Sequence, residues 1–185
     1  MFIQSEATPN PATLKFLPGN PVYLDGTAEF NSADDAEKSP LAKALFSING
    51  VHSVFFGSDF ISVTKAGGEW SHLKPEILGA IMEHFTSGAP LFAEGSTPNI
   101  AQDQFYSESD AETVKMINEL LETRIRPAVA GDGGDIQFRG FKDGIVYLQM
   151  KGACSGCPSS TATLKHGIQN LLTHFLPAVK SVEQI

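Results

Sequence analysis

The chain has 185 residues, a net charge of -8 and a hydrophobic content of 42%, with 18% charged residues. This composition is typical of a globular protein long enough for one full core or two small domains. The acidic balance, without any run of Lys and Arg, argues against nucleic acid as a main partner. No apolar stretch is long enough to cross a bilayer, and residues 1–6 lack the basic and apolar parts of a secretory signal. We therefore expect no membrane partner and a reducing compartment, with bacterial cytoplasm preferred and the mitochondrial matrix as the alternative.

The first half of the chain alternates between strand-like and helix-like patterns. Prolines punctuate residues 7–12, and because proline cannot donate to a sheet ladder, the flanking strands should lie at a sheet edge or end where the prolines fall. Ser39 followed by Pro40 predicts a helix start, and Asn49-Gly50 predicts its end. The expected strands are 2–6, 13–17, 51–56 and 60–65, and the expected helices are 40–48 and a second one from Lys74 or Pro75 to Phe85. Together they predict a compact α+β unit.

The second half begins after a stretch without periodicity, residues 88–107, which is predicted to be an interdomain linker. A helix should follow, with Ser109 and Glu112 forming a capping box and Pro127 stopping it. The remaining expected elements are strands 136–141 and 145–151 joined by a tight turn, a helix 158–175 and a last strand 179–185. The chain is thus predicted to form two α+β domains, 1–87 and 108–185, each a small, mainly antiparallel sheet packed with helices.

Both cysteines of the chain, Cys154 and Cys157, lie between a predicted strand and a predicted helix. Pro158 suits the first helical position, so Cys157 is expected at or next to the N-cap. A helix N-terminus carries partial positive charge and free N–H groups, which favour thiolate over thiol and can donate to sulfur ligands. Ser155 and Gly156 are small, so both sulfurs are expected to point outward from a short, exposed loop.

Two cysteines at this spacing are compatible with more than one chemistry. They can exchange disulfides, as in thioredoxin-like proteins, or supply half of a four-thiolate metal site. Ala153 stands where a thioredoxin-like motif usually has an aromatic residue, and a predicted hairpin precedes the motif, which both argue against exchange. A metal site would need a second copy of the chain, because one chain supplies only two thiolates. The residues alone leave thiol exchange and metal binding open.

Other polar residues carry weaker signals. The glycine-rich run 131–135 follows a predicted helix and not a strand, so it is expected to be a turn with positive φ and not a nucleotide-binding loop. His166 and His174 lie on the last predicted helix, where a solvent-facing or packed role is expected more than zinc binding. No Ser/His/Asp set or carboxylate pair has a motif context, so hydrolytic catalysis has no support.

Several motifs together resemble the NifU-like (Nfu) iron-sulfur scaffold family. The residues that resemble its C-terminal domain are Arg126-Pro127, Gly131-Asp132-Gly133-Gly134-Asp135, Lys151 through Cys157, Ser160 and Thr163 through Ile168. The segments Glu6 through Pro11 and Lys15-Phe16 resemble the N-terminal domain of the bacterial and mitochondrial members. The similarity covers nearly the whole chain.

In that family, a homodimer shares a [4Fe-4S] cluster through two CxxC pairs and passes it to apo-proteins. The resemblance therefore implies that Cys154 and Cys157 are the iron ligands, that the chain is a homodimer when loaded, and that it is a carrier and not an enzyme. It also implies two kinds of partner, apo iron-sulfur acceptor proteins and upstream cluster assembly proteins. The alternatives are a thiol-disulfide oxidoreductase with Cys154 as the attacking thiolate and a zinc-bridged interaction module.

Overall fold

The computed structural model describes residues 1–98, 104–155 and 158–185. The chain divides into two compact units, Met1–Ile100 and Ala101–Ile185, which we name the N-terminal unit and the C-terminal unit. Each unit has a hydrophobic core of its own. None of the helices in the described ranges is long and apolar enough to pass through a bilayer.

The N-terminal unit is built on a five-stranded antiparallel sheet. Its strands are β1 (Gln4–Ala7), β2 (Thr13–Leu17), β3 (Ala28–Phe30), β4 (Val51–Phe56) and β5 (Ile61–Lys65), in the order β1-β2-β5-β4-β3. β1 lies at the sheet edge and β2 ends directly before Pro18, as the positions of the prolines predict. β4 and β5 form the predicted hairpin, in which Val54 lies opposite Val63.

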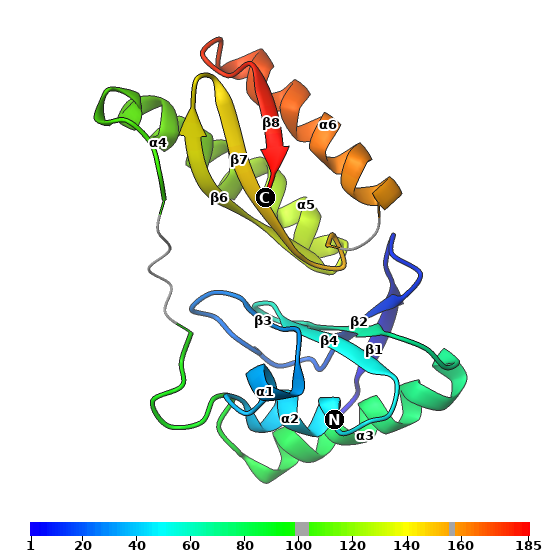
Figure 1. Ribbon diagram of the computed structural model, residues 1–185. Coiled ribbons are helices and arrows are strands. Elements are labelled where there is room, and N and C mark those ends of the chain that lie inside the picture. Colours follow the sequence, from blue (N-terminus) through cyan, green and yellow to red (C-terminus); the bar gives the residue numbers. More distant parts are fainter. Residues whose placement is uncertain (99–103, 156–157) are drawn as a thin grey trace. The chain divides into compact units, whose positions relative to one another are not determined.

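Three helices cover one face of this sheet: α1 (Ala33–Ala36), α2 (Pro40–Phe46) and α3 (Trp70–Ser87) (Figure 1). The start of α2 is confirmed, because the Ala42 amide donates a hydrogen bond to the Ser39 hydroxyl at 3.2 Å and Pro40 is the first helical residue. Gly50 follows with a φ of 107°, a conformation that other residues rarely adopt. The largest buried side chains of the core are Phe16, Leu41, Leu45, Phe56, Ile61, Ile77 and Ile81.

Two parts of the N-terminal unit differ from the sequence prediction. α3 begins at Trp70, so Pro75 lies inside the helix and not at its first turn. Leu73 is buried in the core, and its burial outweighs the hydrogen bond that Pro75 cannot donate. The sequence pattern also misses β3 and α1, because elements of three or four residues are too short to show a periodicity.

The C-terminal unit is built on a three-stranded sheet in the order β6-β7-β8, with β6 at Gly134–Lys142, β7 at Ile145–Gly152 and β8 at Ser181–Gln184. β6 and β7 form the predicted hairpin, and its turn has positive φ at Asp143 (54°) and Gly144 (80°). β8 pairs with β7 in parallel. Val146, Leu148 and Met150 are buried, as predicted. Sheets packed with helices in both units confirm the predicted α+β class.

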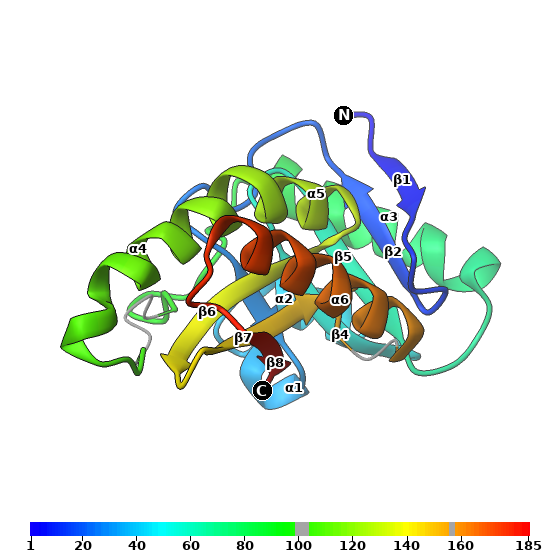
Figure 2. The same cartoon turned by 90° about the horizontal axis from the view of Figure 1, so that it is seen from above.

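The helical elements of the C-terminal unit are a 3-10 turn (Glu108–Asp110), α4 (Ala111–Leu120), a π-helical segment (Leu121–Ile125), α5 (Arg126–Gly131) and α6 (Pro158–Phe175). Figure 2 shows α4 and α5 following one another as one rod, with α6 alongside. Their buried residues pack onto the sheet in one core, which includes Val114, Ile117, Leu121, Ile168 and Leu172. The bounds of α6 agree with the prediction.

The first helix of this unit differs from the prediction at both ends. The 3-10 turn is closed by a hydrogen bond from the Asp110 amide to the Ser107 carbonyl at 2.9 Å, and it places Asp110 at the N-cap without a side-chain cap. The predicted capping box at Ser109 is therefore wrong. Pro127 does not stop the helix either, because the π-helical segment before it widens the turn and accommodates the missing N–H.

Both ends of the predicted linker 88–107 pack against the unit that each adjoins. The Ala93 amide donates to the Lys38 carbonyl at 2.8 Å in the N-terminal unit. The Phe105 amide donates to the Arg139 carbonyl at 3.1 Å, alongside β6 in the C-terminal unit. The middle of the linker lies outside the described residues, and the predicted domain boundaries stay predictions.

Candidate functional site

Cys154 lies in the loop that joins β7 to α6. Gly152, with a φ of 67°, turns the chain at the end of β7. Both the amide and the hydroxyl of Ser155 donate to the Gly152 carbonyl, at 3.1 and 2.9 Å, and so close a tight turn around Cys154. The Thr161 hydroxyl donates to the Cys154 carbonyl at 2.8 Å. The backbone of Cys154 is thus tied to the end of the strand and to the first turns of the helix.

The glycine-rich run 131–135 packs directly against this loop. Gly133 has a φ of 83°, which confirms the predicted turn, and its carbonyl accepts a hydrogen bond from the Ala153 amide at 3.1 Å. A Cβ atom on Gly134 would lie only 2.7 Å from the Cys154 Sγ and 2.7 Å from the Lys151 carbonyl oxygen. The glycine therefore makes the room in which the sulfur of Cys154 packs.

The environment of the Cys154 thiol differs from the expected exposed loop. Its residue is only 7% exposed and belongs to the hydrophobic core of the C-terminal unit. Burial, and after it the repulsion between a thiolate and the carboxylates of Asp132 and Asp135, raise the pKa of the Cys154 thiol to about 12. The expected preference for thiolate is therefore wrong for this residue in the metal-free chain, because burial and two carboxylates outweigh the helix N-terminus.

The structure describes only some of the other candidate ligands. Cys157 and Gly156 lie outside the described residues, so the assignment of Cys154 and Cys157 as a ligand pair stays a prediction. Within the described ranges, no group of three or more His, Cys, Asp and Glu side chains comes together as a metal site. His174 is exposed and meets the ring of its neighbour Phe175 edge-on, with ring centres 5.0 Å apart, which fits the predicted solvent-facing role.

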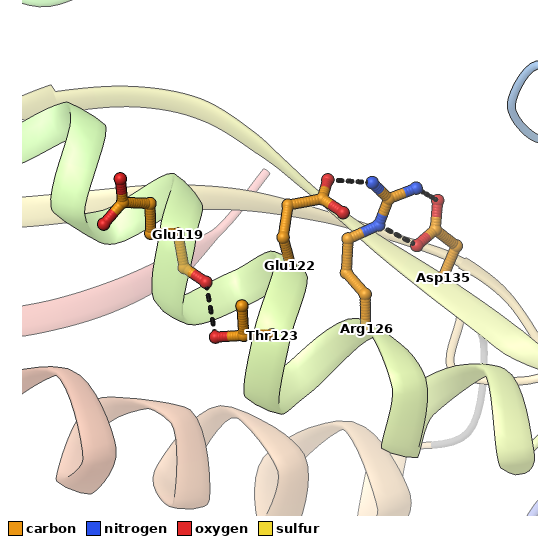
Figure 3. A network of polar contacts seen from close by, with 5 residues as sticks. All are labelled: Glu119, Glu122, Thr123, Arg126 and Asp135. Carbon is orange, nitrogen blue, oxygen red and sulfur yellow. Dashed lines mark hydrogen bonds and ion pairs between the residues drawn. The ribbon is translucent and has the colours of Figure 1, made fainter.

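A half-buried ion pair, in which the carboxylate is buried and the guanidinium partly exposed, lies next to the candidate loop, and Figure 3 shows it from close by. The Arg126 guanidinium donates to both carboxylate oxygens of Asp135, from Nε at 2.9 Å and from Nη2 at 3.1 Å. Nη1 of Arg126 also contacts Glu122, one helical turn earlier. Burial alone would lower the pKa of Arg126, but its hydrogen bonds to Asp135 and Glu122 raise it. The guanidinium therefore stays charged beside the Asp135 side chain, which is only 4% exposed.

This ion pair fixes the strand end beside Cys154. Asp135 lies opposite Lys151 in the β6–β7 ladder, and Gly134 lies opposite Gly152. Arg126 is the first residue of α5, so the pair joins that helix to the start of β6. Sequence reasoning quoted Arg126 and Asp135 as motif residues but gave them no role. The nine-residue separation of two opposite charges across a glycine turn is the signal that could have indicated the pair.

The site combines a soft sulfur ligand with a loop backbone that is fixed by hydrogen bonds to the end of β7, to α6 and to the glycine-rich run 131–135. Thiolate sulfur is the ligand type that iron-sulfur clusters and zinc use in proteins. A chain with only two cysteines, three positions apart, can supply two of the four sulfur ligands of such a centre. Fold and site together define a two-unit α+β protein with one small cysteine site in its C-terminal unit.

Comparison with known proteins shows which family this is. The family model "Scaffold protein Nfu/NifU N terminal" matches residues 3–88, and the model "NifU-like domain" matches residues 117–183. Over its full length the chain is 57% identical to "NifU-like protein 4, mitochondrial" of Arabidopsis thaliana, of which it covers 66%. It is 54% identical, again over its full length, to "NFU1 iron-sulfur cluster scaffold homolog, mitochondrial" of Homo sapiens, of which it covers 72%. The chain belongs to the Nfu/NifU iron-sulfur cluster scaffold family.

The chain spans about two thirds of the length of the curated relatives it matches. Among solved structures, it is similar to the solution NMR structure of a NifU-like protein from Saccharomyces cerevisiae, with 25% sequence identity and a TM-score of 0.46. That match covers 51% of this chain and 86% of the yeast chain.

Proposed function

We propose that this protein is a scaffold and carrier that binds a [4Fe-4S] cluster between two copies of the chain and transfers it to apo-proteins. Cys154 and Cys157 of each copy would supply the four thiolate ligands. The observation that carries the proposal is the position of Cys154, held by its backbone between β7 and α6 in a chain whose only other cysteine is three residues away. Membership of a scaffold family supports the same role.

The burial of Cys154 has a consequence for loading. A ligand must be deprotonated to bind iron, and binding to a cation drives that deprotonation. Because the pKa of the Cys154 thiol is raised to about 12 without metal, loading must release a proton and bring the sulfur out of the core. The cluster would then be held by two short loops across a dimer, which favours release to an acceptor over permanent storage.

Thiol-disulfide exchange is the alternative function, and the structure disfavours it. An attacking cysteine needs a low pKa and access to its substrate. Cys154 has the opposite properties, with a raised pKa and 7% exposure. A zinc-bridged interaction module uses the same ligands as the scaffold, and only the metal content distinguishes the two.

The partners and the compartment follow from the same proposal. A carrier of this kind receives its cluster from upstream assembly proteins and gives it to apo iron-sulfur proteins. The relatives reported above are named as mitochondrial proteins, which favours the mitochondrial matrix over the bacterial cytoplasm for this chain. Transfer of a whole cluster replaces the donor thiolates on its iron by acceptor thiolates and leaves the iron and sulfide of the cluster unaltered, so we propose a carrier and not an enzyme.

Anaerobic reconstitution with iron and sulfide tests the proposal. About two irons per chain, found together with the mass of a dimer, would match one [4Fe-4S] cluster shared by two CxxC pairs. Cys154→Ser and Cys157→Ser should each abolish cluster binding, whereas Ser155→Ala, in the same loop, should leave the iron content nearly unchanged. Mixing the loaded protein with an apo [4Fe-4S] enzyme should then restore the activity of that enzyme.

Three outcomes would contradict the scaffold function. A metal-loaded monomer without added thiol would remove the shared cluster. Stable zinc in place of iron, or a mixed disulfide trapped on Cys154 by Cys157→Ser, would support the zinc module or the oxidoreductase instead.

A further inference from the structure

The N-terminal unit carries a groove that takes no part in the cysteine site. Its two walls are the loop at residues 21–25 and the segment at residues 91–97, and it encloses about 520 Å³. All the residues that line it belong to the N-terminal unit.

Both walls are held by backbone hydrogen bonds. The Val22 amide donates to the Ser58 carbonyl at 2.8 Å, which fixes the first wall to the β4–β5 turn. The Ala93 amide donates to the Lys38 carbonyl at 2.8 Å, which fixes the second wall to the start of α2. A groove that is already formed costs little conformational entropy when a ligand enters it.

The lining of the groove is mainly apolar. The rings of Tyr23 and Phe92 meet edge to face with centres 4.9 Å apart, and Phe92 packs in turn on Phe56 of the core. Leu91 also lines the groove, and Leu24 beside it is 72% exposed. Tyr23 is buried, and Leu91 and Phe92 are half-buried. An exposed leucine beside half-buried apolar side chains is typical of a surface that receives an apolar side chain from a partner.

Negative charge surrounds this apolar lining. Asp25 and Glu94 lie one on each wall, both are exposed, and neither forms an ion pair with any residue in the described ranges. The charge of Asp25 also reaches Tyr23 in the lining. The pKa of Tyr23 is raised, mainly by burial and secondly by the charge of Asp25.

The nearby basic residues do not offset this charge. Residues 16–37 hold five carboxylates and neither Lys nor Arg. Lys38 and Lys43, which follow, are paired with Asp35 at 3.5 Å and Glu37 at 2.8 Å. The groove therefore attracts cations and repels anions, which disfavours nucleic acid and anionic lipid, and also a second copy of this acidic chain.

We propose that this groove docks a segment of a partner protein in which a leucine or phenylalanine stands between lysines or arginines. The apolar side chain lies in the groove against Leu24, Leu91 and Phe92, and the flanking cations lie against Asp25 and Glu94. The proposal does not depend on the cluster function, because no residue of the groove belongs to the C-terminal unit.

A pair of short peptides tests the docking surface on the full chain. The probe is a seven-residue peptide of sequence Gly-Lys-Leu-Lys-Phe-Lys-Gly, and its control has glutamate in place of each lysine. We expect the lysine peptide to shift the backbone amide NMR signals of residues 21–25 and 91–97 in a saturable way, with a Kd on the order of 0.1 mM. The glutamate peptide should shift none of them, and raising the salt concentration should weaken binding several-fold.

Charge-reversal variants separate the groove from general attraction. Asp25→Lys combined with Glu94→Lys should weaken binding by about tenfold or more, because it removes both attractive charges and adds repulsion. Glu76→Lys combined with Glu83→Lys is the matched control: it changes the net charge equally on exposed positions of α3, away from the groove, and should weaken binding by about twofold at most. Both variants should take up iron like the unchanged protein.

The proposal is overturned by any of four results. These are no saturable shift at about 1 mM peptide, equal binding of the glutamate peptide, equal weakening by both double variants, or shifts that fall outside the two walls. A mass that rises with protein concentration and falls back in Leu24→Ser would assign the groove to a second copy of the chain instead.

Discussion

The two units of this protein share the α+β class but differ in charge and in what their cores contain. Residues 1–98 hold five lysines, no arginine and eleven Asp or Glu, whereas residues 104–185 hold eight Lys or Arg and nine Asp or Glu. The N-terminal unit has a core rich in aromatic rings and carries an excess of acidic side chains. The C-terminal unit instead buries charge, in the Arg126–Asp135 pair, and places a thiol in its core.

This difference shows which unit gives up folding stability in order to form a chemical site. Apolar burial without polar groups is the most economical way to stabilise a fold. A buried ion pair contributes little net stability, but it fixes its neighbours and is costly to break. The C-terminal unit accepts that cost beside Cys154. The N-terminal unit also buries polar side chains, such as the hydrogen-bonded Thr13 and Ser39, but they lie outside its inferred function, which is on the surface. Substitutions should therefore act on one unit at a time.

The largest effect is expected in the core of the N-terminal unit. Phe56 is fully buried and meets the ring of Phe30 at 5.1 Å, so Phe56→Ala should lower the free energy of unfolding by about 3–5 kcal/mol. Trp70 is the single tryptophan and lies in α3, so its fluorescence reports this unit alone. Phe2→Ala, at a position 79% exposed, should change stability by less than about 0.5 kcal/mol. A matching loss of iron binding would contradict the independence of the units.

Breaking the buried ion pair should have the next largest effect, and only in the C-terminal unit. Arg126→Ala leaves the Asp135 carboxylate buried without its guanidinium partner, which should cost about 3 kcal/mol. Glu122→Gln, on the exposed side of the same arginine, should cost less than about 0.5 kcal/mol. Denaturation followed by far-UV circular dichroism measures both, while the Trp70 transition stays in place.

A second substitution distinguishes the charge from the packing of Arg126. Asp135→Asn in the Arg126→Ala background should recover part of the lost stability, because a neutral amide is cheaper to bury than a carboxylate that has lost its guanidinium partner. If the double variant is no more stable than Arg126→Ala, the loss comes from the packing of the arginine chain, and the ion pair does not hold the loop.

Gly134→Ala should have a smaller effect that is centred on Cys154. The new Cβ would meet the Cys154 sulfur and the Lys151 carbonyl oxygen at 2.7 Å, and this overpacking should cost about 1–3 kcal/mol. Because the sulfur can move and the paired backbone cannot, Cys154 should become more accessible. Iodoacetamide should then alkylate Cys154 faster in a Cys157→Ser background, where it is the sole thiol.

Gly131→Ala is the matched control for this variant. A Cβ atom at Gly131 would meet nothing within 4 Å, so its stability and alkylation rate should stay close to those of the unchanged chain. Equal alkylation rates in the two glycine variants would show that Gly134 does not keep the thiol buried.

The parts of the fold that the sequence predicts are those that depend on neighbouring residues. Ser39 and Pro40 determine the start of α2, because both act inside its first turn. Asp143 and Gly144 determine the β6–β7 turn, because both adopt a positive φ. The two cysteines, three positions apart, similarly indicate a site without any knowledge of the fold.

The parts that the sequence does not predict depend on distant contacts. The π-helical segment Leu121–Ile125 lets the helix pass Pro127, since Leu121 and Ile125 are both buried against the sheet. Phe175 fits the apolar stripe of α6, yet it is 45% exposed and lies beneath the Arg124 guanidinium at 5.1 Å. The burial of Cys154 likewise follows from Gly134, which is twenty positions earlier and reaches it only through the β6–β7 pairing.

The last and smallest predicted effect is a pH dependence that only the C-terminal unit should show. The pKa of Cys154 is about 12 in the folded chain and ordinary in the unfolded one, so above pH 9 the unfolded state loses its proton first. The stability that the neutral thiol contributes is complete below pH 9 and is lost as the pH rises toward 12.

Between pH 9 and pH 10 the metal-free chain should lose about 1 kcal/mol of unfolding free energy relative to Cys154→Ala. The comparison with this variant removes the contribution of tyrosines and lysines, which titrate in both proteins. Far-UV circular dichroism follows the loss, and Trp70 fluorescence should show none, because the N-terminal unit has no thiol. If the unfolding free energy falls equally with pH in both proteins, Cys154 ionises as readily in the folded chain as in the unfolded one. Its burial would then not argue against thiol-disulfide exchange.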